Sequence, residues 1–84
     1  MEGSSNKPVR VFRSGMLSAS VFANDAKDGS TFHKVSLQRT YADGEQLKST
    51  TSLGRDDLPA SALLLERAWA FVCDAEAEKK SRKG

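Results

Sequence analysis

Residues 30–53 read STFHKVSLQRTYADGEQLKSTTSL, and this stretch decides the fold because it predicts two strands and the turn between them. β-branched and aromatic residues predict a strand over residues 30–41, in which Val35 and Leu37 face inward. Asp43-Gly44 predicts a type I′ turn with these two residues at its centre, because both central positions need positive φ. The stretch therefore predicts an antiparallel hairpin with one apolar face.

Two further strands precede this hairpin, whose second strand is the fourth strand of the chain. The fourth strand is expected over residues 45–53, with Leu47 and Leu53 as its inward anchors. Upstream, regular alternation of apolar and polar residues predicts the second strand over residues 16–24. A short first strand begins after Pro8, a position where the missing N–H is tolerated. Turn residues join successive strands, so the sheet is expected to be a meander.

A single helix follows the strands. Asp56 and Asp57 predict its start, because acidic side chains cap a helix N-terminus and interact favourably with its dipole. Pro59 fits the first turn, where its missing N–H has no helical partner to lose. The helix is expected over residues 57–78. The fold is therefore expected to be α+β: a four-stranded antiparallel sheet followed by one C-terminal helix packed on one face.

The composition is that of one small globular domain. Charged residues make up 29% and hydrophobic residues 38% of the 84-residue chain, which is an ordinary globular composition rather than a disordered one. The domain is assigned to residues 8–78, between a flexible arm at residues 1–7 and a basic, flexible tail at residues 79–84. The single Cys73, together with the lack of a signal-like or membrane-length apolar run, predicts a cytoplasmic protein.

The helix carries more apolar surface than contact with one sheet requires. At about 100° per residue, one stripe is expected to pack on the sheet. This stripe comprises Leu58, Ser61, Ala62, Leu65, Ala68, Trp69, Val72 and Cys73. A second row, Leu64, Phe71 and Ala75, adjoins it. Two arrangements are open: the row folds over the sheet edge of a monomer, or it forms the interface of a homodimer. The surplus of apolar surface favours the homodimer.

One helix covers only one face of the sheet, so the other face meets water or a partner. By parity, that face carries basic, aromatic, hydroxyl and amide side chains and no acid. They are Arg10, Phe12, Ser18, Ser20, Phe22, Phe32, Lys34, Ser36, Gln38, Thr40, Gln46, Lys48, Thr50 and Ser52. Phe12 stays open between the two faces, because a bulge in the short first strand would turn it inward.

Rings among cations and hydroxyls are typical of surfaces that bind single-stranded nucleic acid, because bases stack on rings and cations follow phosphates. The residues predicted to bind nucleic acid are Arg10, Arg13, Phe22, Phe32, Lys34, Gln38, Arg39 and Lys48. The competing interpretation is a protein-interaction module. In that case the uncovered face or the second helix row docks a partner protein, and the basic residues serve solubility.

The sequence shows no constellation for catalysis or metal binding. His33 and Cys73 lie on different predicted elements, whereas a structural zinc site needs four ligands. Cys73 is expected to be a small buried residue, and His33 a partly buried, hydrogen-bonded one. Capping accounts for Asp56 and Asp57 better than a catalytic carboxylate pair does. The chain is therefore predicted to be non-enzymatic, with no cofactor and no metal.

Three motifs carry a resemblance to known proteins. Arg39-Thr40-Tyr41-Ala42-Asp43-Gly44, then Ser49-Thr50-Thr51-Ser52-Leu53-Gly54-Arg55-Asp56-Asp57-Leu58, then Ala68-Trp69 are similar to motifs in a group of small uncharacterised bacterial proteins. Leu47 and Leu53 depart from that pattern, which has larger aromatics there. The order of four strands and a helix resembles the single-stranded-DNA-binding transcriptional regulator fold of positive cofactor 4-type coactivators and Whirly proteins. This resemblance implies a homodimer built partly through the helix, whose curved sheets present basic and aromatic residues to single strands.

Overall fold

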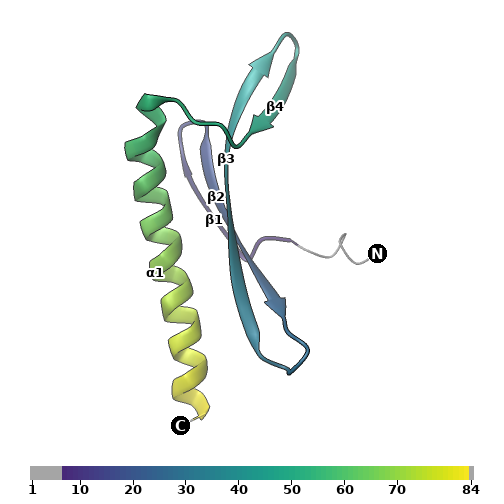
Figure 1. Cartoon of the computed structure of the whole chain (residues 1–84), viewed down its shortest axis with the longest axis vertical. Helices are drawn as coiled ribbons and strands as arrows, with labels where there is room; N and C mark the ends of the chain where they lie inside the picture. The colour runs from purple at the N-terminus through teal and green to yellow at the C-terminus, as the bar shows by residue number, and fades with distance from the viewer. Residues whose placement is uncertain (1–6, 84) are drawn as a thin grey trace.

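The computed structural model describes residues 7–83, with side chains from residue 7 to residue 77, as four strands followed by one helix. In chain order the elements are β1 (Arg10–Ser14), β2 (Leu17–Asp25), β3 (Thr31–Asp43), β4 (Gln46–Thr50), the 3-10 turn η2 (Arg55–Asp57) and α1 (Leu58–Lys83). The strands lie in the order β1-β2-β3-β4, and each neighbouring pair is antiparallel. The predicted α+β meander with one C-terminal helix on one face is confirmed (Figure 1).

The element ends differ from the prediction mainly at β4 and α1. β4 ends at Thr50, and Leu53 lies in the following connection, where it packs against the core. α1 continues to Lys83, so residues 79–83 of the predicted basic tail have helical backbone. The arm predicted at residues 1–7 lies, apart from Lys7, outside the described residues.

Glycine at the first central position shapes both tight hairpins. Asp43 pairs with Gln46 across the β3–β4 turn, which leaves Gly44 and Glu45 as the central residues. Gly44 has a φ of 67°, and no non-glycine residue among those described has a positive φ. Glycine takes this position in a type II′ turn, so the predicted type I′ turn with Asp43 at its centre is wrong. Gly15, with a φ of 59°, plays the same part between β1 and β2.

A longer loop, residues 26–30, joins β2 to β3 and is organised by one carboxylate. Oδ1 of Asp28 accepts hydrogen bonds from the Ser30 hydroxyl at 2.7 Å and from the Ser30 backbone N–H at 2.9 Å. Both bonds favour the charged carboxylate and hold the pKa of Asp28 below its ordinary value. Gly29 completes the loop with a φ of 91°, a conformation that side-chain-bearing residues rarely adopt.

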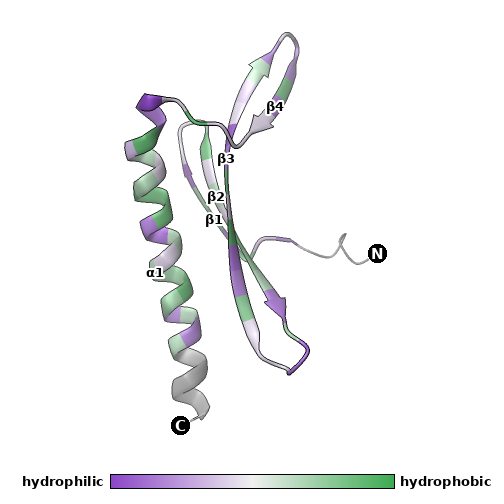
Figure 2. Cartoon of the chain, viewed as in Figure 1, coloured by the Kyte–Doolittle hydropathy of each residue, from purple (hydrophilic) through white to green (hydrophobic). Residues whose placement is uncertain are grey.

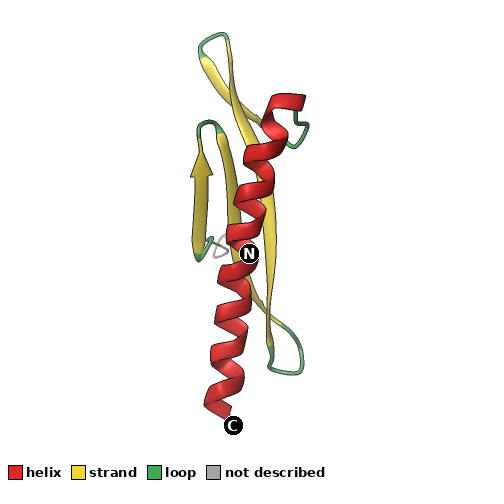
Figure 3. Ribbon diagram, turned by 90° about the vertical axis from the view of Figure 1, so that its left-hand side faces the viewer, coloured by secondary structure: helices red, strands yellow, loops and turns green. Residues whose placement is uncertain are grey.

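The core lies between β2 and the first half of α1. Leu17, Ala19 and Val21 of β2 and Leu64 and Ala68 of the helix are buried, and Leu17, Ala19 and Leu64 form one cluster. Partly buried residues surround this contact: Phe12, Leu37, Leu53 and Ala60. The helix lies along the length of the sheet, while the β3–β4 hairpin extends beyond the helix start (Figures 1 and 3). The result is a thin, two-layer protein with a small core.

The side of α1 that packs on the sheet is rotated around the helix relative to the predicted stripe, by about one residue position. Leu64 has no exposed surface, and Phe71 and Ala75 are half-buried on the same side. Of the two predicted arrangements, the structure shows the one in which this row packs on the sheet, and Leu64 has no surface left for the predicted dimer interface. The exposed members of the stripe predicted to face the sheet are Leu58, Ala62, Leu65, Trp69 and Cys73. Hydrophobic residues recur along much of the helix (Figure 2). The helix does have surplus apolar surface, but other residues form it: Leu58, Leu63, Leu65 and Trp69 are exposed.

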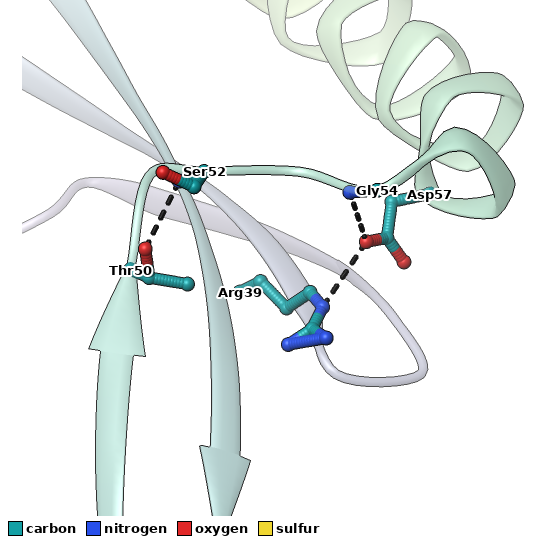
Figure 4. Close-up of polar contacts among 5 residues, drawn as sticks. All are labelled: Arg39, Thr50, Ser52, Gly54 and Asp57. Carbon is teal, nitrogen blue, oxygen red and sulfur yellow. Dashed lines mark hydrogen bonds and ion pairs between the residues drawn. The ribbon is translucent and has the colours of Figure 1, made fainter.

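Asp57 fixes the start of the helix (Figure 4). Its Oδ2 accepts a hydrogen bond from the Gly54 backbone N–H at 2.9 Å and one from Arg39 Nε at 3.1 Å. Asp56, in contrast, is 92% exposed and contacts the neighbouring Arg55 at 3.4 Å. Asp57 thus caps the 3-10 turn that leads into α1 from its third position, and Gly54 rather than an aspartate is the N-cap residue. This carboxylate also ties the helix start to β3.

Candidate nucleic-acid interface

The strand register divides the sheet into two faces, because paired residues and alternate residues along a strand share a face. Leu17, Ala19 and Val21 are buried under the helix and identify the helix side. The opposite face carries Val11, Arg13, Ser18, Ser20, Phe22, Asn24, Phe32, Lys34, Ser36, Gln38, Thr40, Ala42, Leu47 and Ser49. This set, termed the open face, contains no acidic side chain within the described strands. In Figure 1 it is the side of the sheet away from α1.

Aromatic rings and a cation meet at one end of the open face. Phe22 lies opposite Lys34 across β2 and β3, and Phe32 is its diagonal neighbour. The Lys34 ammonium is 5.7 Å from the centroid of the Phe32 ring, within range of a cation–π interaction. Phe32 is 40% exposed, so part of its ring is accessible for stacking. Phe22, Asn24, Lys34 and Ser36 also line a shallow depression of about 300 Å³.

A polar row lies at the other end of the open face. Arg13, Ser18 and Gln38 are neighbours across β1, β2 and β3. Gln38 is separated from Lys34 by Ser36, a span of about 13 Å along β3 at the usual rise of a strand. Arg13 and Gln38 are both exposed. The two cations of the open face are therefore spaced along it, with hydroxyl groups between them.

Arg10 and Phe12 lie on the helix side. The predicted place of Arg10 on the uncovered face is therefore wrong, and Phe12, whose side the sequence left open, faces the helix. Phe12 pairs with the fully buried Ala19, and its ring meets the Phe71 ring edge-on with 6.3 Å between centroids. The guanidinium carbon of Arg10 lies 4.8 Å from the Phe12 centroid and 5.8 Å from the Phe71 centroid. Arg10 thus lies over two aromatic rings at the β1 side of the core.

β4 also has the opposite parity from that predicted. Lys48 pairs with Tyr41 on the helix-side face, and its Nζ lies 2.8 Å from Oδ2 of Asp43. Gln46 and Thr50 share that face with it by alternation. Leu47 pairs instead with Ala42 on the open face and is 72% exposed, so its predicted inward anchoring is wrong. The predicted contribution of Lys48 to the nucleic-acid face is wrong for the same reason.

Arg39 belongs to the helix start rather than to the open face. It alternates with Gln38 and shares the face of the buried Leu17, with which it pairs. Its Nε donates to Asp57, so the guanidinium is already matched with a carboxylate (Figure 4). A hollow of about 420 Å³ beside this pair is lined by both Asp56 and Asp57, which makes it unfavourable for a polyanion.

Metal and cysteine chemistry find little support in the described residues. No group of three His, Cys, Asp or Glu side chains within them is placed to hold a metal ion. The side chain of His33 is 6% exposed, and its Nδ1 lies 2.9 Å from Oε2 of Glu76. The predicted partly buried, hydrogen-bonded histidine is thus confirmed. Cys73 is exposed, so its predicted burial is wrong.

Comparisons with known proteins add no assignment. A scan against protein-family models finds no matching family, and searches of the curated proteins and of the solved structures find no similar protein. Within the described part of the chain, no helix is long and apolar enough to cross a membrane.

Proposed function

We propose that the open face binds single-stranded nucleic acid with little sequence preference. The observation that carries the proposal is that Arg13, Phe22, Phe32 and Lys34 share one acid-free face. Bases stack on accessible rings for about 1–3 kcal/mol each, and cations follow the phosphates. The serine hydroxyls and Gln38 supply hydrogen bonds to phosphates or base edges. DNA and RNA single strands present the same rings and phosphates, so both fit.

The distribution of ion pairs supports this assignment. On the helix-side face, Lys48 is paired with Asp43 and Arg39 with Asp57. Among the described residues, neither Arg13 nor Lys34 is paired with an acid. The formal net charge of +2 therefore understates the positive potential of the open face. A polyanion meets unneutralised cations there and paired cations on the other side.

The proposed class is a binding module that resembles transcriptional regulators, acts in the cytoplasm and is not an enzyme. The open face offers stacking, charge and hydrogen bonds, which are sufficient for binding. The competing protein-interaction module uses the same exposed residues but needs no phosphate, so salt dependence separates the two functions.

Fluorescence anisotropy with a labelled oligothymidylate at several salt concentrations tests the proposal. Each cation that neutralises a phosphate contributes about 0.7 to the slope of log affinity against log salt for a single strand. We expect Arg13→Ala and Lys34→Ala each to lower the slope by about this amount. Lys48→Ala is the matched control, because it removes an equal charge from the opposite face. Absence of binding at about 50 mM salt, where phosphate contacts are strong, would refute the proposal.

Phe32→Ala tests stacking separately from charge. Loss of one stacked base predicts weakening of about fivefold to over a hundredfold, with the salt slope unchanged. Leu47→Ala is the control, because it removes another exposed apolar side chain of the same face at a site far along the β3–β4 hairpin. Equal affinities of Phe32→Ala and the wild type, with circular dichroism showing both folded, would mean that the ring does not stack on a base.

A further inference from the structure

β3 is longer than the strands that flank it, and part of one edge has no neighbour. β2 pairs with β3 from Thr31 to Arg39, whereas β4 pairs with its other edge only from Arg39 to Asp43. From Phe32 to Gln38 that other edge has no strand beside it within the described residues. An uncovered strand edge presents backbone donors and acceptors that favour pairing with another strand.

The direction of the backbone groups on this edge follows from one hydrogen bond. The Thr40 N–H donates to the Met16 carbonyl at 2.9 Å and therefore points toward the β1–β2 hairpin. Successive residues of a strand point their N–H and C=O groups to alternate sides. His33, Val35 and Leu37 consequently direct theirs toward the uncovered edge.

Exposed apolar side chains lie on the helix side of the same edge. Leu65 and Trp69 precede Glu76 by about three and two helical turns and share its side of α1. Glu76 in turn contacts His33 of β3. Val35 is 40%, Leu65 is 42% and Trp69 is 69% exposed. α1 runs antiparallel to β3 between the Arg39–Asp57 contact at one end and the His33–Glu76 contact at the other, so Leu65 and Trp69 lie along the same length of β3 as Val35. The opposite side of the helix is closed by the Arg10, Phe12 and Phe71 cluster. Apolar surface and unpaired backbone thus coincide at one edge.

We propose that this edge pairs with the same edge of a second copy, β3 against β3, about a two-fold axis at Val35. In this register Val35 faces Val35 and His33 faces Leu37 of the second copy. Phe32 faces Gln38, and Lys34 faces Ser36. No like charges oppose each other, and the seven uncovered residues of each copy are all used. The Trp69 and Leu65 side chains of both helices then flank the paired strands, which buries apolar surface from each copy.

Other registers fit less well. An axis at Lys34 places two ammonium groups directly opposite each other, which is destabilising. An axis at Leu37 places residue 35 opposite Arg39 of the second copy, where β4 already occupies the edge. The length of the gap and the charge of Lys34 therefore favour the axis at Val35.

A partner is also consistent with the shape of the protomer. Its radius of gyration is 15.2 Å, compared with about 12 Å for a compact domain of this length. A strand-paired dimer joins two thin sheets into one of eight strands and brings the two open faces into one continuous surface. The inference is independent of nucleic-acid binding, because strand pairing and burial of Trp69 need no ligand.

Light scattering and engineered cross-linking, both without nucleic acid, test the proposal. We expect the wild-type chain to show twice the 9.1 kDa mass of one copy, and Trp69→Glu to show the mass of one copy. Leu47→Glu, which adds an acid at a more exposed site away from the edge, should retain the doubled mass. In a Cys73→Ser background, Val35→Cys should form a disulfide-linked dimer on mild oxidation, because opposed residues of this kind lie about 5.5 Å apart. Leu47→Cys in the same background should not.

Three results would overturn the proposal. A wild-type chain that stays monomeric over the accessible concentration range excludes self-pairing and leaves the edge for a different partner. Assemblies larger than two copies exclude a closed two-fold interface. A dimer that survives Trp69→Glu, and in which Val35→Cys fails to cross-link while the variant is folded, uses a different surface.

Discussion

Replacing Leu64 by alanine should destabilise the protein far more than the same replacement at either neighbouring leucine. Leu63, Leu64 and Leu65 are consecutive and chemically identical, but they are 44%, 0% and 42% exposed. Leu64 lies against Leu17 and Ala19 of β2 in the centre of the core. The three variants therefore measure which side of α1 faces the sheet.

The magnitude follows from burial. Truncation of a fully buried leucine costs about 2–5 kcal/mol, because transfer free energy is lost and a cavity remains. A leucine that is nearly half exposed in the native state loses roughly 1 kcal/mol or less, because less of its surface is removed from water. In a domain of this size each kcal/mol corresponds to about 4–8 °C in Tm. Leu64→Ala should therefore lower Tm by at least about 8 °C.

Urea denaturation followed by far-ultraviolet circular dichroism gives the free energies of unfolding. Each variant is measured at two protein concentrations, since any contribution of association depends on concentration whereas burial within the protomer does not. If Leu64→Ala does not fold, Leu64→Val provides a smaller truncation at the same site. Equal losses for the three alanine variants, or a larger loss for Leu65→Ala at the lower concentration, would refute the helix orientation described above.

Three further outcomes follow from local contacts. Asp57→Ala should cost about 1–2 kcal/mol in urea denaturation, because a loop N–H and a guanidinium lose their acceptor, whereas the exposed Asp56→Ala should stay within about 0.5 kcal/mol of wild type. Gly44→Ala should lower stability by about 1–2 kcal/mol in thermal melting, because its φ of 67° strains an alanine even though no atom obstructs the methyl group. The folded-state pKa of Asp28 is below its ordinary value of 3.8. The contribution of this carboxylate to the free energy of unfolding is therefore complete above pH 3.8 and is lost as the pH falls through the folded-state pKa. The stability difference between wild type and Asp28→Ala, from urea titrations at several pH values, should therefore be largest near neutrality and vanish at low pH, and a pH-independent difference would contradict this.

The number and order of the elements were predictable because their signals are local. Alternation over residues 16–24 and 30–41 is long enough to identify strands and to place Phe22 and Lys34 on the same face. Each turn carries its own glycine, and the carboxylates before α1 mark the helix start. These features depend on neighbours a few residues away, and neighbours of this kind are visible in a sequence.

Errors arose where one element must be related to another. In a two-residue hairpin an even-numbered residue always pairs with an odd-numbered one. Gly15 therefore requires Phe12 to share the face of Ala19, and Gly44 requires Leu47 to share the face of Ala42. Treating β1 and β4 as separate alternating segments missed this rule. The turn residues contained enough information to place Arg10 and Lys48 on the helix side.

The helix orientation was harder to predict. Three consecutive leucines and several alanines give α1 apolar residues on most sides, so periodicity alone does not identify the buried one. Packing decides it: Leu64 lies against small and medium residues of β2, while the larger Trp69 lies to one side. The contact of Arg39 with Asp57 is likewise long-range and has no local signal.

β2 and β4 pair with different lengths of β3. The amides of β3 that are hydrogen-bonded to a neighbouring strand are therefore mainly even-numbered in its first part, whereas odd-numbered amides become hydrogen-bonded in its second part. From Phe32 to Gln38, even-numbered amides lie on the β2 side, the side to which the Thr40 amide donates, and odd-numbered ones face the uncovered edge. From Arg39 onward, the odd-numbered amides face β4. Slow hydrogen exchange is therefore expected at the even-numbered amides in the first part of β3, and the odd-numbered amides should become slow from Arg39 onward. The exchange rate at Val35, the middle of the uncovered stretch, reports directly whether another strand occupies that edge.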